Sequence, residues 1–195
     1  MKKKILLLAT VVMCVSIIAS GTLAYFTSED EVHNVITTNA VDIQIEEWQE
    51  TENGLVPYPK DNPIAVMPGA TVSKIATVKN IEAEAYIRAK FEIVITGADG
   101  GIMELSPETL TSIVTLTMND VSWLRKDDDG EWWYYKAPVG IGASTEAFFT
   151  EVVFDGSNIT NEYQNCTVDI TVKAQGVQTA NNGSNVMEAA GWPVE

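Results

Sequence analysis

Two stretches of the chain alternate between apolar and other residues with the period of a β-strand. They span residues 85–95 and 167–175. A period of two puts the apolar side chains on one face of a strand and the remaining side chains on the other, so we expect two half-buried strands. The side chains expected to face the core are Ile87, Ala89, Phe91, Ile93, Ile95, Val168, Ile170, Val172 and Ala174. The side chains expected to face outward are Tyr86, Arg88, Lys90, Glu92, Thr167, Asp169, Thr171, Lys173 and Gln175.

Shorter runs extend this pattern along the chain, and most of them are rich in the β-branched and aromatic residues that favour strands. They cover residues 41–48, 71–78, 121–124, 131–136 and 146–154. Clusters of Pro, Gly, Asn and Asp separate the runs and predict turns. Several short strands at this spacing predict an all-β fold, a jelly-roll-like antiparallel β-sandwich with one or two short helices.

One segment has the signals of a helix. Ser106 suits the N-cap position, Pro107 the first helical position, and Glu108 the positive end of the helix dipole. We expect this helix to run to about Leu116.

The charge of the chain limits its partners. The 195 residues include 12 Lys and Arg against 27 Asp and Glu, which is a net charge of −15. Affinity for nucleic acid depends on basic side chains that release counterions from phosphates, so we expect no nucleic-acid partner. A chain of this length buries one sizeable core, and we expect one folded domain.

The N-terminus has the three regions of a secretory signal peptide. Three lysines precede an apolar stretch at residues 5–19, and small residues follow. Thr22 and Ala24 stand at −3 and −1 of a cut between Ala24 and Tyr25, so we expect export to remove residues 1–24. The apolar stretch is shorter than a spanning helix requires, and no comparable run follows, so we expect a mature form that does not span a membrane.

Export would change both the charge and the cysteine content. Removing three of the 12 basic residues and no acid leaves nine against 27, a charge of −18. Cys14 lies inside the apolar stretch and not at its end, so we expect no lipid on it. Cys166 would then be the remaining cysteine, which predicts no intramolecular disulfide and a small buried side chain in a strand.

The histidine content argues against an enzyme. His33 is the single histidine of the chain, whereas the common catalytic zinc sites need two or three. A serine triad would also have to recruit His33, and no Gly-x-Ser-x-Gly motif accompanies it. We expect no catalytic residues and no cofactor.

Residues 127–130, with the sequence Asp-Asp-Asp-Gly, offer carboxylates in a turn. Asp127 and Asp129 could serve as Ca²⁺ ligands, although the motif lacks the alternating acids and the distant bidentate Glu of an EF-hand. Asp-Gly between residues 123–124 and the aromatic residues 132–135 is also a hairpin signal, and we favour the hairpin.

Four consecutive aromatic residues, 132–135, must place two rings on each face of a strand. An exposed pair could stack on a sugar or form a protein interface. Alternatively, both faces are covered, with Trp133 and Tyr135 under a loop. Both interpretations remain open.

Several segments in a fixed order carry a resemblance to a known family. They are residues 21–29 and 35–43 around the signal junction, followed by residues 67–72, 78–80, 84–88, 129–135 and 142–145. The first two resemble the secretion signature of proteins cut by the SipW-type signal peptidase, and the others are similar to the body of the camelysin and TasA family. The resemblance implies a secreted subunit of Gram-positive cells, in the extracellular matrix or at the cell surface, that self-associates into biofilm-matrix fibres.

In such fibres the N-terminal segment of one subunit resembles a donor strand added to the sheet of the next. An open sheet edge does offer unpaired backbone groups to an extended segment. We therefore divide the chain into a signal peptide (1–24), an N-terminal donor segment (25–40), a sandwich domain (41–177) and a polar C-terminal tail (178–195), whose residues 178–184 we expect to be mobile. The donor side chains would be Tyr25, Phe26, Val32, Val35 and Ile36.

Two other functions compete with the fibre subunit. A secreted binding module would hold a carbohydrate or Ca²⁺ through its acidic loops and aromatic run, and would stay monomeric. A camelysin-like protease is opposed by the missing zinc-binding histidines.

Overall fold

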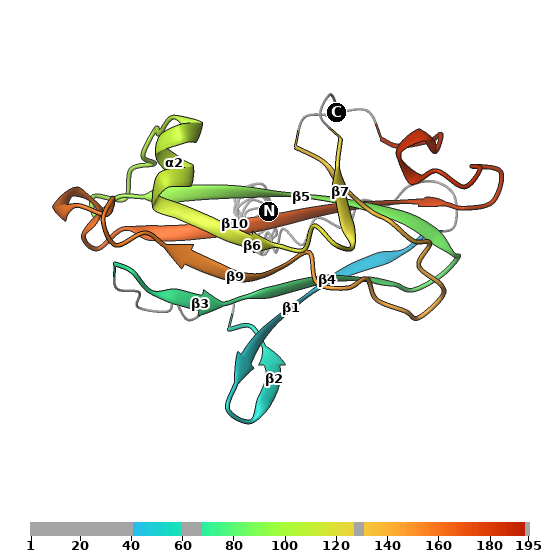
Figure 1. Cartoon of the computed structure of the whole chain (residues 1–195), viewed down its shortest axis with the longest axis horizontal. Helices are drawn as coiled ribbons and strands as arrows, with labels where there is room; N and C mark the ends of the chain where they lie inside the picture. The colour runs from blue at the N-terminus through green and yellow to red at the C-terminus, as the bar shows by residue number, and fades with distance from the viewer. Residues whose placement is uncertain (1–40, 60–67, 127–130, 194–195) are drawn as a thin grey trace, which may run out of the picture. The chain divides into compact units, whose positions relative to one another are not determined.

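The computed structural model describes residues 41–59, 68–126 and 131–193. These residues form an antiparallel β-sandwich with one short α-helix (Figure 1), which confirms the expected fold class. The jelly-roll connectivity stays a prediction. No helix within this part of the chain is long and apolar enough to cross a membrane.

One layer of the sandwich is a four-stranded sheet in the order β10-β5-β8-β7. Its strands are β5 (Ala85–Thr96), β7 (Trp123–Arg125), β8 (Trp133–Tyr135) and β10 (Thr167–Gln178). β5 and β10 pair along their whole length and are the two strands that the alternating pattern predicts. The antiparallel pairing of β7 with β8 confirms the expected hairpin.

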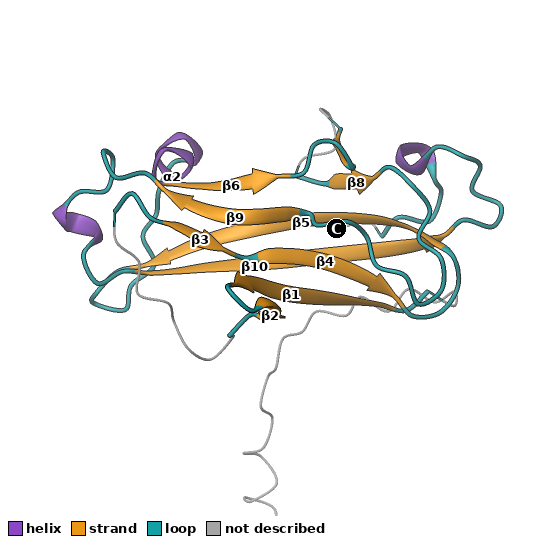
Figure 2. Cartoon of the chain, turned by 60° about the horizontal axis from the view of Figure 1, so that its bottom comes forward, coloured by secondary structure: helices purple, strands orange, loops and turns teal. Residues whose placement is uncertain are grey.

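The other layer is built from two groups of three strands. They are β1 (Ile43–Thr51), β2 (Gly54–Pro57), β3 (Thr71–Ser73), β4 (Ile75–Asn80), β6 (Val114–Met118) and β9 (Phe149–Phe154). Their orders are β2-β1-β4 and β3-β9-β6. Only Lys74 separates β3 from β4, and its N–H donates to Thr150 O at 3.1 Å, while Phe148 N–H donates to Ala76 O at 2.7 Å. These bonds join the two groups into one layer, in which β3 runs on into β4 (Figure 2).

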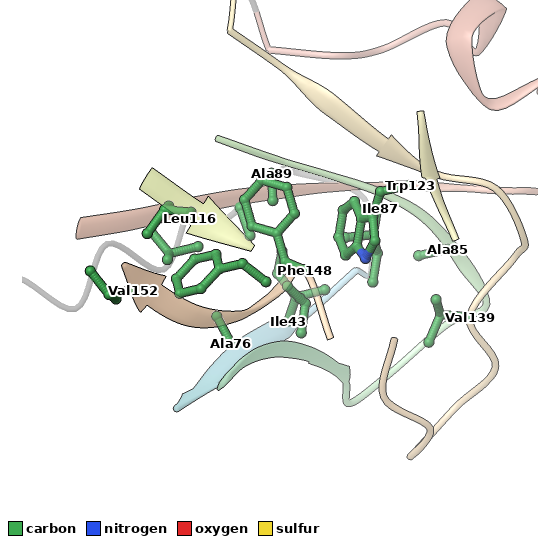
Figure 3. Close-up of a cluster of buried hydrophobic side chains, with 14 of the residues drawn as sticks. Ile43, Ala76, Ala85, Ile87, Ala89, Leu116, Trp123, Val139, Phe148 and Val152 are labelled. Carbon is green, nitrogen blue, oxygen red and sulfur yellow. The ribbon is translucent and has the colours of Figure 1, made fainter. Parts of the chain in front are cut away.

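The core between the layers is centred on aromatic side chains. Trp123 and Phe148 are almost fully buried, and their ring centres lie 4.8 Å apart at an interplanar angle of 46°. Ile87 and Ala89 of β5 face the same cluster, as expected (Figure 3). Tilted ring pairs of this kind add to the stabilisation from buried area, so the aromatic pair strongly couples the two layers.

The start of β1 and the end of β10 pack closely at Gly176. A Cβ atom at this position would lie 2.8 Å from Cγ1 of Val41 and 3.3 Å from Cγ2 of Ile43. The approach therefore requires glycine, and it closes this side of the sandwich.

The helix is shorter than expected. α2 spans Pro107–Ile113, and the Ser106 hydroxyl caps it by accepting from Thr109 N–H at 3.2 Å. From Val114 the backbone is extended and continues into β6, whose β-branched residues favour a strand. The prediction of a helix to Leu116 is therefore wrong by three residues.

The sequence also did not predict β2. This short strand pairs with the end of β1, and the hairpin they form projects away from the other strands (Figure 1). All four residues of β2 are exposed, so its sequence has no strong apolar alternation.

Candidate assembly surface

The outermost strands of the two layers differ greatly in length. β2, β6 and β7 have four, five and three residues, whereas β10 has 12. Within the described chain, β5 is the one strand that pairs with β10. Every second residue of an edge strand turns its N–H and C=O away from its neighbour, so residues 167–173 of β10 present the longest row of such groups among the described edge strands. We call residues 167–173 the open edge.

Apolar side chains line the inner face of the open edge and are only partly covered. Val168 and Ile170 are half-buried, and so is Ile93, which lies opposite Ile170. Farther along the same face, Val172 and Ala174 are buried. The core is therefore less complete beneath Val168 and Ile170 than beneath Val172 and Ala174.

The outer face of the same sheet carries a second apolar cluster. Its buried members are Tyr86, Trp132, Tyr134, Val177, Val186 and Ala189. The last two belong to residues 179–193, which we call the C-terminal strap, and which include the 3₁₀ turn η2 (Val186–Glu188). The strap packs on the outer face of β5, β8 and β10, although we expected its first residues to be mobile.

Arg88 forms the centre of this outer cluster and is 5% exposed. Its guanidinium carbon lies 4.3 Å from the ring centre of Trp132 and 4.8 Å from that of Trp192. A guanidinium between two indoles is favourable because the ring faces are negative and the flat cation loses little hydration. The sequence predicts the outward direction of Arg88 correctly, but not its burial.

Hydrogen bonds also hold the Arg88 guanidinium. Nε donates to Gln175 Oε1 at 2.8 Å, Nη1 to the Tyr134 hydroxyl at 3.1 Å and Nη2 to the Pro193 carbonyl at 2.9 Å. The three acceptors come from β10, β8 and the strap. Arg88 therefore links the strap to two neighbouring strands.

Two further bonds fix the course of the strap. The Tyr86 hydroxyl donates to Gly183 O at 2.7 Å, and Trp192 Nε1 donates to Val186 O at 3.2 Å. The Trp192 ring also meets that of Tyr134 edge-on, with ring centres 5.6 Å apart. The strap is thus attached at its beginning and at its end.

The aromatic run is covered on both faces. Trp133 and Tyr135 turn toward the core, where Tyr135 lies 5.2 Å from Trp123. Trp132 and Tyr134 lie under the strap. The covered alternative is therefore right, but the pair beneath a connecting segment is Trp132 and Tyr134, not Trp133 and Tyr135.

A buried ion pair lies where the β1–β2 hairpin leaves the sandwich. Lys74 is 6% exposed, and its Nζ lies 2.7 Å from Glu47 Oε1 and 3.9 Å from the ring centre of Tyr58. Burial and the Glu47 carboxylate raise the pKa of Tyr58. The pair anchors the hairpin base, because removing either partner would leave a buried charge without compensation.

Several residues singled out by sequence lie outside the described residues. They are the cleavage pair Ala24 and Tyr25, the donor side chains Tyr25, Phe26, Val32, Val35 and Ile36, the Ca²⁺ candidates Asp127 and Asp129, and His33. Within the described ranges, no group of three or more His, Cys, Asp and Glu residues is placed to hold a metal ion. Cys166 is half-buried and lies just before β10, with its Sγ 3.7 Å from Met103 Sδ, so the prediction of a buried side chain within a strand is wrong.

The strap and its partners Arg88 and Gln175 are what sequence reasoning missed. A signal existed, because Val186, Ala189 and Trp192 recur every three residues after a polar stretch at residues 181–185. A second signal is that Tyr86 and Arg88 share the outward face with half of the aromatic run.

The comparisons with known proteins add no relative to this description. No protein-family model matches the chain, and neither the curated proteins nor the solved structures contain a match.

Proposed function

We propose that this chain is an exported structural subunit that polymerises head to tail by donor-strand addition. Residues 25–40 of one copy, once freed by the signal peptidase, would add along the open edge of the next copy. The observation that supports this most is the open edge itself, a long edge strand with half-buried apolar side chains on its inner face. The product would be an extracellular fibre of the matrix or cell surface.

The chemistry of the donor segment matches that edge. In an extended donor segment Val35 would turn inward to the partly covered positions Val168 and Ile170, whereas Val32 and Ile36 lie on the opposite face of the segment. Burying a half-exposed aliphatic side chain gains about 1 kcal/mol, and backbone bonds along the strand add to this. A contact between different surfaces of two copies does not close on itself, so it propagates as a filament.

Charge would regulate the same step. The mature chain has nine basic and 27 acidic residues, so copies repel one another at low salt, where the Debye length is about 30 Å. At about 0.1 M salt the Debye length falls to about 10 Å, so added salt should favour assembly.

The binding-module alternative loses its main argument. The aromatic side chains in the described ranges are buried or half-buried, so the run at residues 132–135 offers no exposed pair of rings for a sugar.

Two single substitutions test the proposal, one on the donor segment and one on the acceptor strand β10. Val35→Asp places a charge on the donor, and Ile170→Asp places one on the acceptor. Each variant alone should form no filaments by electron microscopy while its circular dichroism stays that of a folded sandwich, because a charge in an apolar slot is costly. The matched control is Thr171→Asp, which adds the same charge to the exposed outer face of the same strand and should polymerise.

Mixing the two defective variants sharpens the test. Val35→Asp keeps a working acceptor edge and Ile170→Asp keeps a working donor, so together they should form one-to-one dimers that do not grow. Filaments from either variant alone, or no dimer from the mixture, would contradict donor-strand addition at this edge.

A further inference from the structure

The described chain contains two Asn-Gly pairs, Asn53-Gly54 and Asn182-Gly183. This dipeptide is where a protein can modify itself, because glycine has no side chain to hinder attack by its own nitrogen on the preceding carboxamide. The attack requires that the asparagine side chain rotate freely toward the backbone. The two pairs differ sharply in this freedom.

Asn53 lies at the exposed tip of the β1–β2 hairpin. Gly54 has a φ of +100°, and the space where a Cβ would lie is empty to 4 Å. Thr51 Oγ1 accepts from Asn53 N–H at 3.3 Å and donates to Gly54 O at 2.8 Å, so it holds only the backbone of the turn. The Asn53 carboxamide makes no hydrogen bond to any described residue.

Asn182 is restrained at both ends of its side chain. Nδ2 donates to Gln178 O at 2.7 Å, and Oδ1 accepts from Ala190 N–H at 2.8 Å. The following carbonyl, that of Gly183, accepts from the Tyr86 hydroxyl. Ring closure at Asn182 would have to break two hydrogen bonds within the strap.

We propose that Asn53 is a site of spontaneous deamidation and isoaspartate formation, and that the strap protects Asn182 from the same reaction. The Gly54 nitrogen forms a bond to Asn53 Cγ, the bond from Cγ to Nδ2 breaks, and ammonia leaves with the proton from Gly54. Water then opens the resulting five-membered imide at either carbonyl, which yields aspartate or isoaspartate.

The position of Asn53 limits the structural consequences. The new carboxylate adds one negative charge at the hairpin tip, and isoaspartate lengthens the backbone of a turn that closes only four residue pairs with β2. The tip of a short two-stranded ladder opens at little cost, which also gives the attacking nitrogen its freedom. The ion pair of Lys74 and Glu47 keeps the hairpin base attached, so the sandwich should stay folded.

Peptide mapping by mass spectrometry tests this on the whole protein aged in mildly alkaline buffer. Deamidation at Asn53 should be at least about tenfold faster than at Asn182, because two ordinary hydrogen bonds protect the latter. In concentrated urea the two rates should converge, since both sites then react as unstructured Asn-Gly. Asn53→Ser should abolish the fast phase of ammonia release and leave the rate of deamidation at Asn182 unchanged.

Equal rates in the folded protein, or faster reaction at Asn182, would overturn the proposal. So would an Asn53 rate that rises strongly in urea, since the folded hairpin would then be protecting the site.

Discussion

The two ends of the β5–β10 ladder have the same alternating sequence but different surroundings. At one end, Tyr86 and Arg88 on the outer face are as buried as Ile87 and Ala89 on the inner face. At the other end, Glu92 on the outer face is exposed and Ile93 on the inner face is only half-buried. The chain covers the first end on both faces, whereas at the second end Ile93, Val168 and Ile170 stay half-buried and Ile95 is buried. In the donor-strand addition that we propose, another copy would complete the second end.

The difference also shows how a polar face can be buried. At the covered end, the Arg88 guanidinium meets two indoles, a hydroxyl, an amide and a carbonyl, which replace hydration that burial removes. At the open end, Lys173 Nζ and Glu92 Oε2 form an ion pair at 3.1 Å in solvent. Substitutions at the two ends should therefore differ in cost.

The largest effect is expected from Arg88→Ala. Gln175 and Tyr134 would lose their buried partner and two indoles would lose the cation between them, so the free energy of unfolding should fall by about 2–4 kcal/mol. Urea denaturation measures the loss. Arg88→Lys keeps the charge without the planar fork, and should lose about half as much. A loss below about 0.5 kcal/mol for Arg88→Ala would mean that the outer cluster contributes no more than an ordinary surface.

A smaller and more local effect is expected from Trp192→Ala. This side chain is half-buried and contacts Tyr134 and Arg88, so its removal should cost about 1–2 kcal/mol. Hydrogen exchange should become faster in residues 179–193 and in the outward-facing residues at the covered end of β5, but not in residues 90–96. Trp192→Phe keeps an aromatic ring and is the matched control. Faster exchange spread evenly along β5 would show that the two ends are not independent.

The sequence predicted the direction of side chains better than their environment. Alternation fixes which face Tyr86, Arg88 and Gln175 occupy, because the strand period is two. It carries no information about what packs on that face, which depends on a segment about 100 residues later in the chain. We did not predict that the strap packs on the sheet, because residues 178–184 are polar. Polar side chains do not prevent this packing, since Tyr86 and Arg88 donate hydrogen bonds to backbone carbonyls of the strap, which any residue provides.

Sequence signals that depend only on neighbouring residues predicted the structure correctly. The Ser106 cap and the Asp-Gly hairpin signal depend on neighbouring residues, and both the cap and the pairing of β7 with β8 are as expected. The helix end at Ile113 depends on the pairing of β6 with β9, which propensity alone does not decide. For the assembly surface, alternation predicted the inner-facing Val168 and Ile170, but not that they would be only half-buried.

The smallest effect is expected from Lys173→Ala at the open end. Both side chains of its ion pair with Glu92 are well exposed, at 37% and 57%, and such pairs contribute about 0–0.5 kcal/mol because water already solvates both charges. The free energy of unfolding should therefore change by less than about 0.5 kcal/mol, and the change should shrink further in salt. Urea denaturation of Lys173→Ala, Glu92→Ala and the double variant gives the pair's own contribution. A coupling above about 1 kcal/mol would show that the outer face at this end is shielded from solvent, and the contrast between the two ends of the ladder would then not hold.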